Sequence, residues 1–335
     1  MTSKIYDIAI VGAGPAGLFG LFYASMRDMD AVLVDSLAQP GGQLATLYPE
    51  KYIYDMPGFP KVLAGRLAED MFEQATMHRR QDVKMGFRVE NLQFDPVEEV
   101  FHLRDAKSDS IMARTILVTT GAGAFRPNRL KVENIENLEG RSVHYFVKDK
   151  SIFQGKPIVI VGGGDSALDW VMNLHGVASE ISLVHRRDKF RAHEDSVQKV
   201  NALPGVNQYL FYEVKELEIG AQDNLEQVTV ENNKTNERLM LRADHLIVNM
   251  GFVADMGPVK NWGLDLQGQA IKVNSLMETN RPGIYAAGDV TTYEGKIKLI
   301  ATGAAEAAIA VNAAKQRLDP SQRMQPGHSS SMFEK

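Results

Sequence analysis

The chain of 335 residues contains no cysteine. That absence excludes disulfide bonds, Cys-ligated zinc, Cys-ligated iron–sulfur clusters and every reaction that uses a protein thiol. Basic residues are in slight deficit, 37 Lys and Arg against 42 Asp and Glu, which gives a formal net charge of −5. A protein dedicated to nucleic acid would carry a basic excess. With 44% apolar and 24% charged residues, the composition is that of a globular protein, and the length predicts two or three domains.

No segment is expected to cross a membrane. The sequence carries no charge from Ile8 to Met26, which is close to the length that spans a bilayer. Glycines and a proline between Gly12 and Gly17 would break a spanning helix, and the run lacks the basic start and cleavage site of a signal peptide. We therefore expect a buried strand, turn and helix here, in a cytoplasmic protein.

The sequence resembles itself at an offset of 150 residues. Residues 7–14 read DIAIVGAG and residues 157–164 read PIVIVGGG. Each copy continues as a helix and a second apolar strand, at residues 31–34 and 181–184. Strands that are apolar throughout and alternate with helices indicate a parallel sheet covered on both faces. The repeat therefore predicts two nucleotide-binding halves.

The glycines of both copies follow the dinucleotide-binding pattern G-x-G-x-x-G/A. The first glycine makes a tight turn, the second lets backbone N–H groups approach a pyrophosphate, and the third small residue allows close packing of helix on strand. The helix N-terminus then faces the negative charge. One such motif is a weak signal, but here a strand precedes and a helix follows it twice, at Gly12–Gly17 and Gly162–Ala167.

The two copies differ at the position that contacts the ribose. Asp35 follows the second strand of the first copy and can accept hydrogen bonds from ribose hydroxyls, as FAD or NAD requires. The matching residue of the second copy is His185, followed by Arg186, Arg187 and Arg191. Such cations bind a 2′-phosphate through charge-assisted hydrogen bonds. A solvated basic turn is the simpler alternative, but the position favours NADPH over NADH.

A third segment suggests a flavin. Residues 283–289 read GIYAAGD and predict a short strand that ends in Gly288-Asp289, followed by an Ala-rich helix around residues 302–314. A carboxylate at a strand end beside a helix N-terminus suits the ribityl hydroxyls and ring edge of a flavin. By itself the segment could equally be a turn with an Asp N-cap. Two different dinucleotides in one chain indicate an electron path from NADPH to bound FAD.

Together these motifs resemble the flavin-dependent pyridine nucleotide oxidoreductases of the thioredoxin reductase type. The matching segments are VGAGPAG at 11–17, TTGA at 119–122, GGGDSA at 162–167, HRRD at 185–188 and AGD at 287–289. Thioredoxin reductases carry a C-x-x-C pair shortly before the second glycine turn. Here residues 144–150 read HYFVKDK, so disulfide reduction by an internal dithiol is impossible.

A closer resemblance is to the thioredoxin-reductase-like ferredoxin–NADP⁺ reductases. It extends to GGQL at 41–44, LYPEKYIYD at 47–55, GAGAF at 121–125, GDSALDW at 164–170, METN at 277–280 and HSSSMF at 328–333. The resemblance implies an α/β fold of two Rossmann-like, three-layer ββα dinucleotide-binding domains. The NADPH domain, 119–250, would be inserted into an FAD domain formed by 1–118 and 251–335. It also implies a homodimeric enzyme that passes electrons between NADPH and ferredoxin or flavodoxin.

The resemblance also implies site residues. FAD would contact Gly12, Gly14, Ala16, Gly17, Asp35, Gln43, Tyr48, Val89, Phe125, Asp289 and Ser330. NADPH would contact Gly162, Gly164, Asp165, Ser166, Ala167, His185, Arg186, Arg187 and Arg191. Tyr48 would stack on one face of the flavin ring, and His328 of the partner subunit would cover the other. No metal site and no catalytic side chain beyond these stacking residues is expected.

The expected chemistry is that of the flavin, which takes a hydride at N5 from the nicotinamide and releases electrons singly to a carrier. If rings cover both flavin faces, the C-terminal tail or the NADPH domain must move first. Glycines at 121–123 and 249–251 are candidate hinges. An acidic ferredoxin requires a local basic patch, for which Arg126, Arg129 and Lys131 are candidates.

Two alternatives remain open from the sequence. The same fold could reduce flavodoxin, a quinone, free flavin or a separate disulfide protein. The chain could instead be a non-enzymatic flavin redox sensor, although a sensor has no need of the second glycine turn and its basic run.

Overall fold

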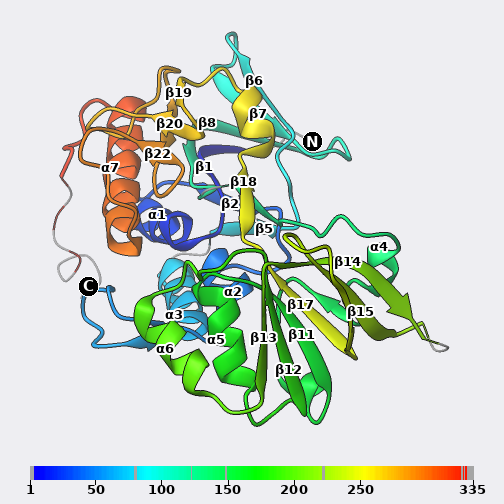
Figure 1. Ribbon diagram of the computed structural model, residues 1–335. Helices are drawn as coiled ribbons and strands as arrows, with labels where there is room; N and C mark the ends of the chain where they lie inside the picture. Colours follow the sequence, from blue (N-terminus) through cyan, green and yellow to red (C-terminus); the bar gives the residue numbers. More distant parts are fainter. Residues whose placement is uncertain are drawn as a thin grey trace. The chain divides into compact units, whose positions relative to one another are not determined.

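The computed structural model describes residues 4–78, 81–121, 123–147, 149–220, 223–325, 327 and 329, without the side chains of 124–126 and 252–254. Its internal contacts divide the chain into two compact units. Unit 1 is Met1–Ala124 with Ala254–Lys335, and unit 2 is Phe125–Val253. Unit 2 is therefore an insertion in the chain of unit 1 (Figure 1). Which cofactor each unit holds stays a prediction.

Unit 1 is built on one central sheet of seven strands. They are β1 (Ile5–Val11), β2 (Ala31–Asp35), β5 (Asp82–Met85), β6 (Asn91–Asp95), β7 (Val100–Arg104), β8 (Ser110–Val118) and β21 (Ile284–Ala286). The order is β5-β2-β1-β8-β7-β6, with β21 beside β8. Strands β5, β2, β1, β8 and β21 are parallel, whereas β8, β7 and β6 form an antiparallel meander.

The longer helices of unit 1 are α1 (Pro15–Met26), α3 (Ala64–Thr76) and α7 (Ile300–Leu318). Helix α1 packs against both α3 and α7 (Figure 1), so nearly all of its surface is apolar. The uncharged run from Ile8 to Met26 is thus a buried strand, turn and helix. No helix in the described part of the chain is long and apolar enough to cross a membrane.

Shorter elements complete unit 1. They are α2 (Gln43–Thr46), β3 (Tyr52–Ile53), β4 (Val62–Leu63), η2 (Gly257–Asn261), β19 (Leu266–Gln267), β20 (Ala270–Lys272) and β22 (Thr291–Thr292). Where the chain passes between the units, β9 (Ala124–Pro127) pairs with β18 (Phe252–Asp255).

Unit 2 repeats the plan with a five-stranded parallel sheet in the order β10-β17-β11-β12-β13. Its elements are β10 (Val143–His144), β11 (Pro157–Gly162), β12 (Glu180–His185), β13 (Val206–Leu210), β17 (His245–Asn249), α4 (Ile135–Leu138), η1 (Ser151–Phe153), α5 (Asp165–Leu174) and α6 (Glu194–Ala202). A second, antiparallel sheet consists of β14 (Tyr212–Ile219), β15 (Leu225–Asn232) and β16 (Arg238–Arg242).

Each unit has a separate apolar core on each face of its parallel sheet. In β1, Ile8 and Ile10 belong to the core that includes the helices, while Ala9 belongs to the core that includes β7. In β11, Ile158 and Ile160 face the helices, and the alternate residues pack with β14 and β15. Successive side chains of a strand point to opposite faces, so both units have three layers. The predicted α/β fold class is confirmed.

A histidine pair, of which His144 is buried and His245 partly buried, joins two strands of unit 2. His144 Nε2 of β10 lies 3.2 Å from His245 Nδ1 of β17, and the edge of the Phe153 ring packs against both rings. Burial, assisted by His245, lowers the pKa of His144 to about 4. Burial also lowers the pKa of His245. In the hydrogen bond between the two neutral rings, one of these nitrogens therefore carries the proton and the other accepts it.

This pair makes the stability of unit 2 depend on pH. Above the unfolded-state pKa of about 6.5 the neutral pair is fully stabilising, and this contribution is lost as pH falls toward 4. At pH 5 the loss is about 2 kcal/mol. We expect His144→Phe to remove most of this difference in the free energy of unfolding between pH 7.5 and pH 5. Urea unfolding at both pH values, followed by Trp170 fluorescence in a Trp262→Phe background, measures the difference. The exposed His175→Gln is the control; an unchanged pH dependence in His144→Phe would contradict the prediction.

Candidate functional site

Strand order places a binding crevice in each unit. In unit 1 the chain proceeds from β1 through β2 to β5 on one side, while β8 and β21 lie on the other. In unit 2, β12 and β13 lie on one side of β11 while β17 and β10 lie on the other. Ligands of open parallel sheets bind at the carboxyl ends of the strands where the order reverses. The relevant ends are those of β1 and β8, and those of β11 and β17.

The first glycine of each motif lies where two backbones touch. A Cβ on Gly12, whose φ is +114°, would lie 2.4 Å from the carbonyl oxygen of Thr119. A Cβ on Gly162 would lie 2.5 Å from the carbonyl oxygen of Asn249. A Cβ on Gly17 would lie 1.8 Å from the carbonyl oxygen of Gly12. These positions exclude every residue but glycine.

The second glycine of each motif faces open space instead. Gly14 and Gly164 are the extended N-cap residues of α1 and α5. No atom lies within 4 Å of the place where a Cβ of either residue would stand. The first amides of both helices therefore have room for a phosphate group, which helix N-termini attract.

Asp35 lies beside the first glycine turn. Its Oδ2 accepts a hydrogen bond from Ala13 N at 2.6 Å, and its Oδ1 accepts one from Leu37 N at 2.8 Å. An ionised carboxylate offers about four lone-pair sites. Asp35 is therefore held in one orientation and can still accept hydrogen bonds from ribose hydroxyls.

Other expected FAD residues come to the same edge of unit 1. The side-chain nitrogen of Gln43 lies 3.5 Å from the place of a Cβ on Gly121. Burial raises the pKa of the half-buried Tyr48, and the nearby carboxylate of Asp289 raises it further. The Cβ of Ala16 lies 3.1 Å from the place of a Cβ on Gly288. The first turn of α1 thus contacts the residue that precedes Asp289.

Four expected FAD contacts are less well placed or cannot be described. Val89 is buried in the core on the β7 face, two residues after Phe87, whose amide donates to the carbonyl oxygen of Asp35 at 2.9 Å. The side chain of Phe125, and His328 and Ser330 altogether, lie outside the described residues. Their roles stay predictions.

His185 packs inward against the second glycine turn. Its ring fills the space beside Gly163, with Cε1 2.1 Å from the place of a Cβ. It stacks on Phe190 at 5.2 Å, and its Nε2 lies 3.0 Å from the carbonyl oxygen of Lys189. Burial is the main cause that lowers the pKa of His185, and the neighbouring arginines lower it further. His185 is therefore neutral near pH 7 and supports the loop from inside.

The exposed cations of the loop are Arg186, Arg187, Lys189 and Arg191, of which the three arginines are the expected NADPH contacts. The backbone amide of Arg191 donates to the carbonyl oxygen of Gly163 at 2.6 Å, which ties the basic run to the glycine turn. The carbonyl oxygen of Arg186 accepts from Asn233 Nδ2 at 2.8 Å. Three arginines thus lie at the edge where a 2′-phosphate is expected.

The remaining residues of the second motif differ in placement. Asp165 lies in the first turn of α5, and its Oδ1 accepts from His193 N, the N-cap of α6, at 2.8 Å. It therefore connects two helices. Ser166 is exposed, and Ala167 is buried under Gly162.

Two of the seven buried side-chain polar atoms without a hydrogen-bond partner in the described part of the chain lie at the crevices. They are the hydroxyl of Thr120, two residues after β8, and Oδ1 of Asn249, at the end of β17. Buried polar atoms are normally paired. A bound dinucleotide would supply partners at both places, so the residues of both crevices fit such ligands.

Sequence reasoning missed a buried ion pair near Asp289, formed by Glu306 and Lys296 with side chains 3% and 6% exposed. A signal was present, since Glu306 is the one charged residue between Ile300 and Ala314. Of the candidate residues for a basic patch, Arg129 pairs with Glu139 at 3.2 Å, so its charge is balanced. Lys131 is exposed, and the side chain of Arg126 is not described.

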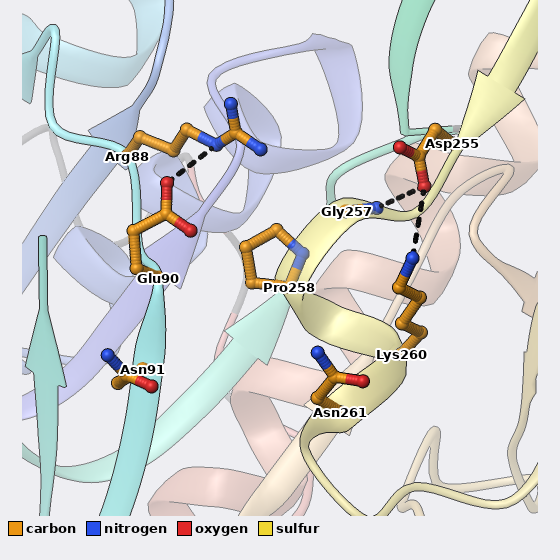
Figure 2. A pocket seen from close by; sticks show the side chains of 8 residues that line it. All are labelled: Arg88, Glu90, Asn91, Asp255, Gly257, Pro258, Lys260 and Asn261. Atoms are coloured by element: carbon orange, nitrogen blue, oxygen red, sulfur yellow. Dashed lines mark hydrogen bonds and ion pairs between the residues drawn. The ribbon is translucent and has the colours of Figure 1, made fainter. Parts of the chain in front are cut away.

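A separate hollow of about 370 Å³ lies on unit 1 (Figure 2). It is lined by Arg88, Glu90, Asn91, Asp255, Gly257, Pro258, Lys260 and Asn261. Arg88 pairs with Glu90 at 3.1 Å, and Lys260 lies 3.9 Å from Asp255. Its cations are thus already balanced, and none of the expected site residues lines it.

These two glycine-turn units are characteristic of one class of enzyme. Residues 6–311 match the family model described as pyridine nucleotide-disulphide oxidoreductase. The chain belongs to this family.

Within the family the chain is similar to proteins named ferredoxin–NADP reductase. "Ferredoxin--NADP reductase 2" of Bacillus thuringiensis (strain Al Hakam) is 46% identical over 343 residues, 98% of each chain. "Ferredoxin--NADP reductase" of Geobacillus thermodenitrificans (strain NG80-2) is 46% identical over 336 residues, again 98% of each. The resemblance inferred from the motifs is confirmed.

Solved structures agree on the fold. The thioredoxin reductase of Lactococcus lactis has a TM-score of 0.75 at 25% identity, covering 93% of this chain and 98% of that one. The thioredoxin reductase of T. acidophilum has a TM-score of 0.76 at 23% identity, covering 94% and 99%.

Substitutions at two glycines of the first motif, Gly14 and Gly17, should have opposite effects on folding and binding. Gly17→Ala places a methyl group inside the backbone at Gly12 and should destabilise unit 1 by about 3 kcal/mol. Gly14→Ala meets no atom and should change the free energy of unfolding by less than about 0.5 kcal/mol, yet weaken dinucleotide binding. Urea unfolding of the apoproteins measures the free energy of unfolding of both variants, and ligand titration measures the dinucleotide affinity of Gly14→Ala. Equal destabilisation by the two substitutions would refute this account of the turn.

Proposed function

We propose that the chain is an NADPH-dependent flavoprotein that passes electrons between NADPH and ferredoxin. FAD would bind the crevice of unit 1 and NADPH that of unit 2. The observation that carries the proposal is the contrast at the ribose position. Unit 1 presents the oriented carboxylate of Asp35, whereas unit 2 presents the exposed Arg186, Arg187 and Arg191 beside its glycine turn.

Two further observations support the electron carrier. Relatives 46% identical over nearly the whole chain are named ferredoxin–NADP reductase. The absence of cysteine excludes exit of electrons through a protein dithiol, despite the family name. FAD, when bound, would supply the chemistry that converts a two-electron hydride into single electrons. Ferredoxin is therefore favoured over a quinone, free flavin or a disulfide protein.

The residues of unit 1 have separable tasks in this proposal. Amides at the start of α1 would hold the pyrophosphate, and Asp35 would orient the ribose. Gln43 and Asp289 would bind the flavin end, and Tyr48 would stack on its ring. A homodimer, with His328 of the partner subunit over the second face, completes the proposal and rests on the resemblance alone. The cytoplasmic location rests on the sequence of residues 8–26.

The electron acceptor can be tested directly. We expect purified holoenzyme with NADPH to reduce cytochrome c at a rate that rises at least about tenfold when ferredoxin is added. A rate independent of ferredoxin would reject the carrier and favour a general flavin reductase. Stimulation by flavodoxin alone would support the alternative acceptor, and bound FAD without NADPH oxidation would support a redox sensor.

The basic loop predicts cofactor preference. Arg187→Ala/Arg191→Ala removes two cations that would make charge-assisted hydrogen bonds to the 2′-phosphate, and should raise KM for NADPH about 100-fold. KM for NADH should change by less than about threefold, because NADH lacks that phosphate. Arg242→Ala, an exposed cation on β16 of the same unit, is the matched control. Equal increases in KM for NADPH and NADH would show that the arginines do not bind the 2′-phosphate.

A further inference from the structure

A buried ion pair lies behind the Gly288–Asp289 turn of unit 1. Lys296 donates to Oε1 of Glu306 in α7 at 2.5 Å, and the hydroxyl of Tyr293 donates to the same oxygen at 2.6 Å. Dehydration offsets most of the attraction within a buried ion pair, so such a pair is weak grounds for a purely stabilising role. Its other contacts suggest what it does.

The second oxygen of Glu306 holds the turn itself. Oε2 accepts a hydrogen bond from Gly288 N at 2.7 Å in a buried setting. The hydroxyl of Thr291 donates to the carbonyl oxygen of Gly288 at 2.8 Å. Both backbone polar groups of Gly288 are therefore bonded, at a residue with the left-handed φ of +84°. The carbonyl oxygen of Gly288 also accepts from Thr291 N at 3.1 Å. These bonds hold the chain where it enters Asp289.

A carboxylate suits this place better than a neutral side chain. Glu306 accepts hydrogen bonds from a backbone amide, an ammonium and a phenol, and the hydroxyl of Thr291 lies 3.5 Å from its Oε2. Every group around it can donate a proton. An amide side chain would turn one NH₂ group toward one of these donors. Lys296 balances the charge that burial would otherwise penalise.

Asp289 and Glu306 lie on opposite sides of the turn. Asp289 is partly exposed and lies close enough to Tyr48 to raise the pKa of that phenol. Glu306 is buried and contacts only the protein side of the turn. A Cβ on Gly303, in the first turn of α7, would lie 3.2 Å from the Cα of Gly288, so the backbone of α7 approaches the turn that its Glu306 side chain also holds.

We propose that Glu306 is a positioning residue for the flavin. It holds the amide of Gly288 and thereby sets where Asp289 presents its carboxylate, while Lys296 and Tyr293 keep Glu306 in place. This inference rests on the proposed function, in which Asp289 binds FAD.

Two double variants separate the hydrogen bond from the charge. Glu306→Gln/Lys296→Met removes both charges and keeps an acceptor for Gly288 N. Glu306→Leu/Lys296→Met removes the same charges and the acceptor. We expect the first to bind FAD within about threefold of the parent, and the second at least about tenfold more weakly, as one buried N–H without an acceptor implies.

Spectroscopy distinguishes positioning from a general loss of structure. The visible absorption and circular dichroism of bound flavin, and its midpoint potential, should change in the Glu306→Leu double variant and match the parent in the Glu306→Gln one. Lys298→Met, an exposed lysine on the same segment, should leave all of these unchanged. Equal FAD affinity and equal flavin spectra in the two double variants would overturn the proposal.

Two single variants complete the test. Glu306→Asp keeps the charge but withdraws the acceptor from Gly288 N, so it should weaken FAD binding even if the Leu variant does not fold; unchanged affinity would also overturn the proposal. Asp289→Asn tests the proposed function separately. If it weakens FAD binding while the double variants are equal, only the role of Glu306 is wrong. If it leaves FAD affinity unchanged, the placement of FAD against Asp289 is wrong.

Discussion

The structure of unit 1 depends on direct backbone contact at the first glycine turn. Gly17 lets the first turn of α1 rest on the carbonyl oxygen of Gly12, and Gly12 lets β1 approach the end of β8. The hydroxyl of Thr119 donates to that same carbonyl oxygen at 2.9 Å. Because these atoms touch, Ala13 N reaches Asp35 and the start of α1 opens toward the crevice. A larger residue at Gly12 or Gly17 would separate all of these groups at once.

Unit 2 uses the same backbone contacts for a different ligand. Gly162 approaches the end of β17 as Gly12 approaches β8, and Gly164 faces open space as Gly14 does. The difference lies after the second strand. Asp35 is oriented by two backbone amides, whereas the arginines that follow His185 are exposed on a loop attached to Gly163. The same backbone arrangement therefore presents a fixed carboxylate acceptor in unit 1 and several exposed arginine side chains in unit 2.

Most of the fold could be predicted because its signals are local. Apolar strands at 8–11 and 158–161, each followed by glycines at set spacing, determine both parallel sheets. Side-chain burial was harder to predict. His185 belongs to a basic run in the sequence but packs inward, because its ring fills the space that Gly163 leaves. Lys296 and Glu306 meet only when α7 folds back onto the Gly288 turn, so residue type alone indicates a surface position for both.

The packing of the His185 ring against Gly163 also constrains how the sequence can vary. Any side chain at 163 would enter the volume that the imidazole occupies, since three ring atoms lie 2.1 to 2.6 Å from that point. A non-glycine residue at 163 therefore requires a smaller residue at 185. Over evolutionary time the two positions should change together, so a substitution of His185 would also change which residues the glycine turn tolerates.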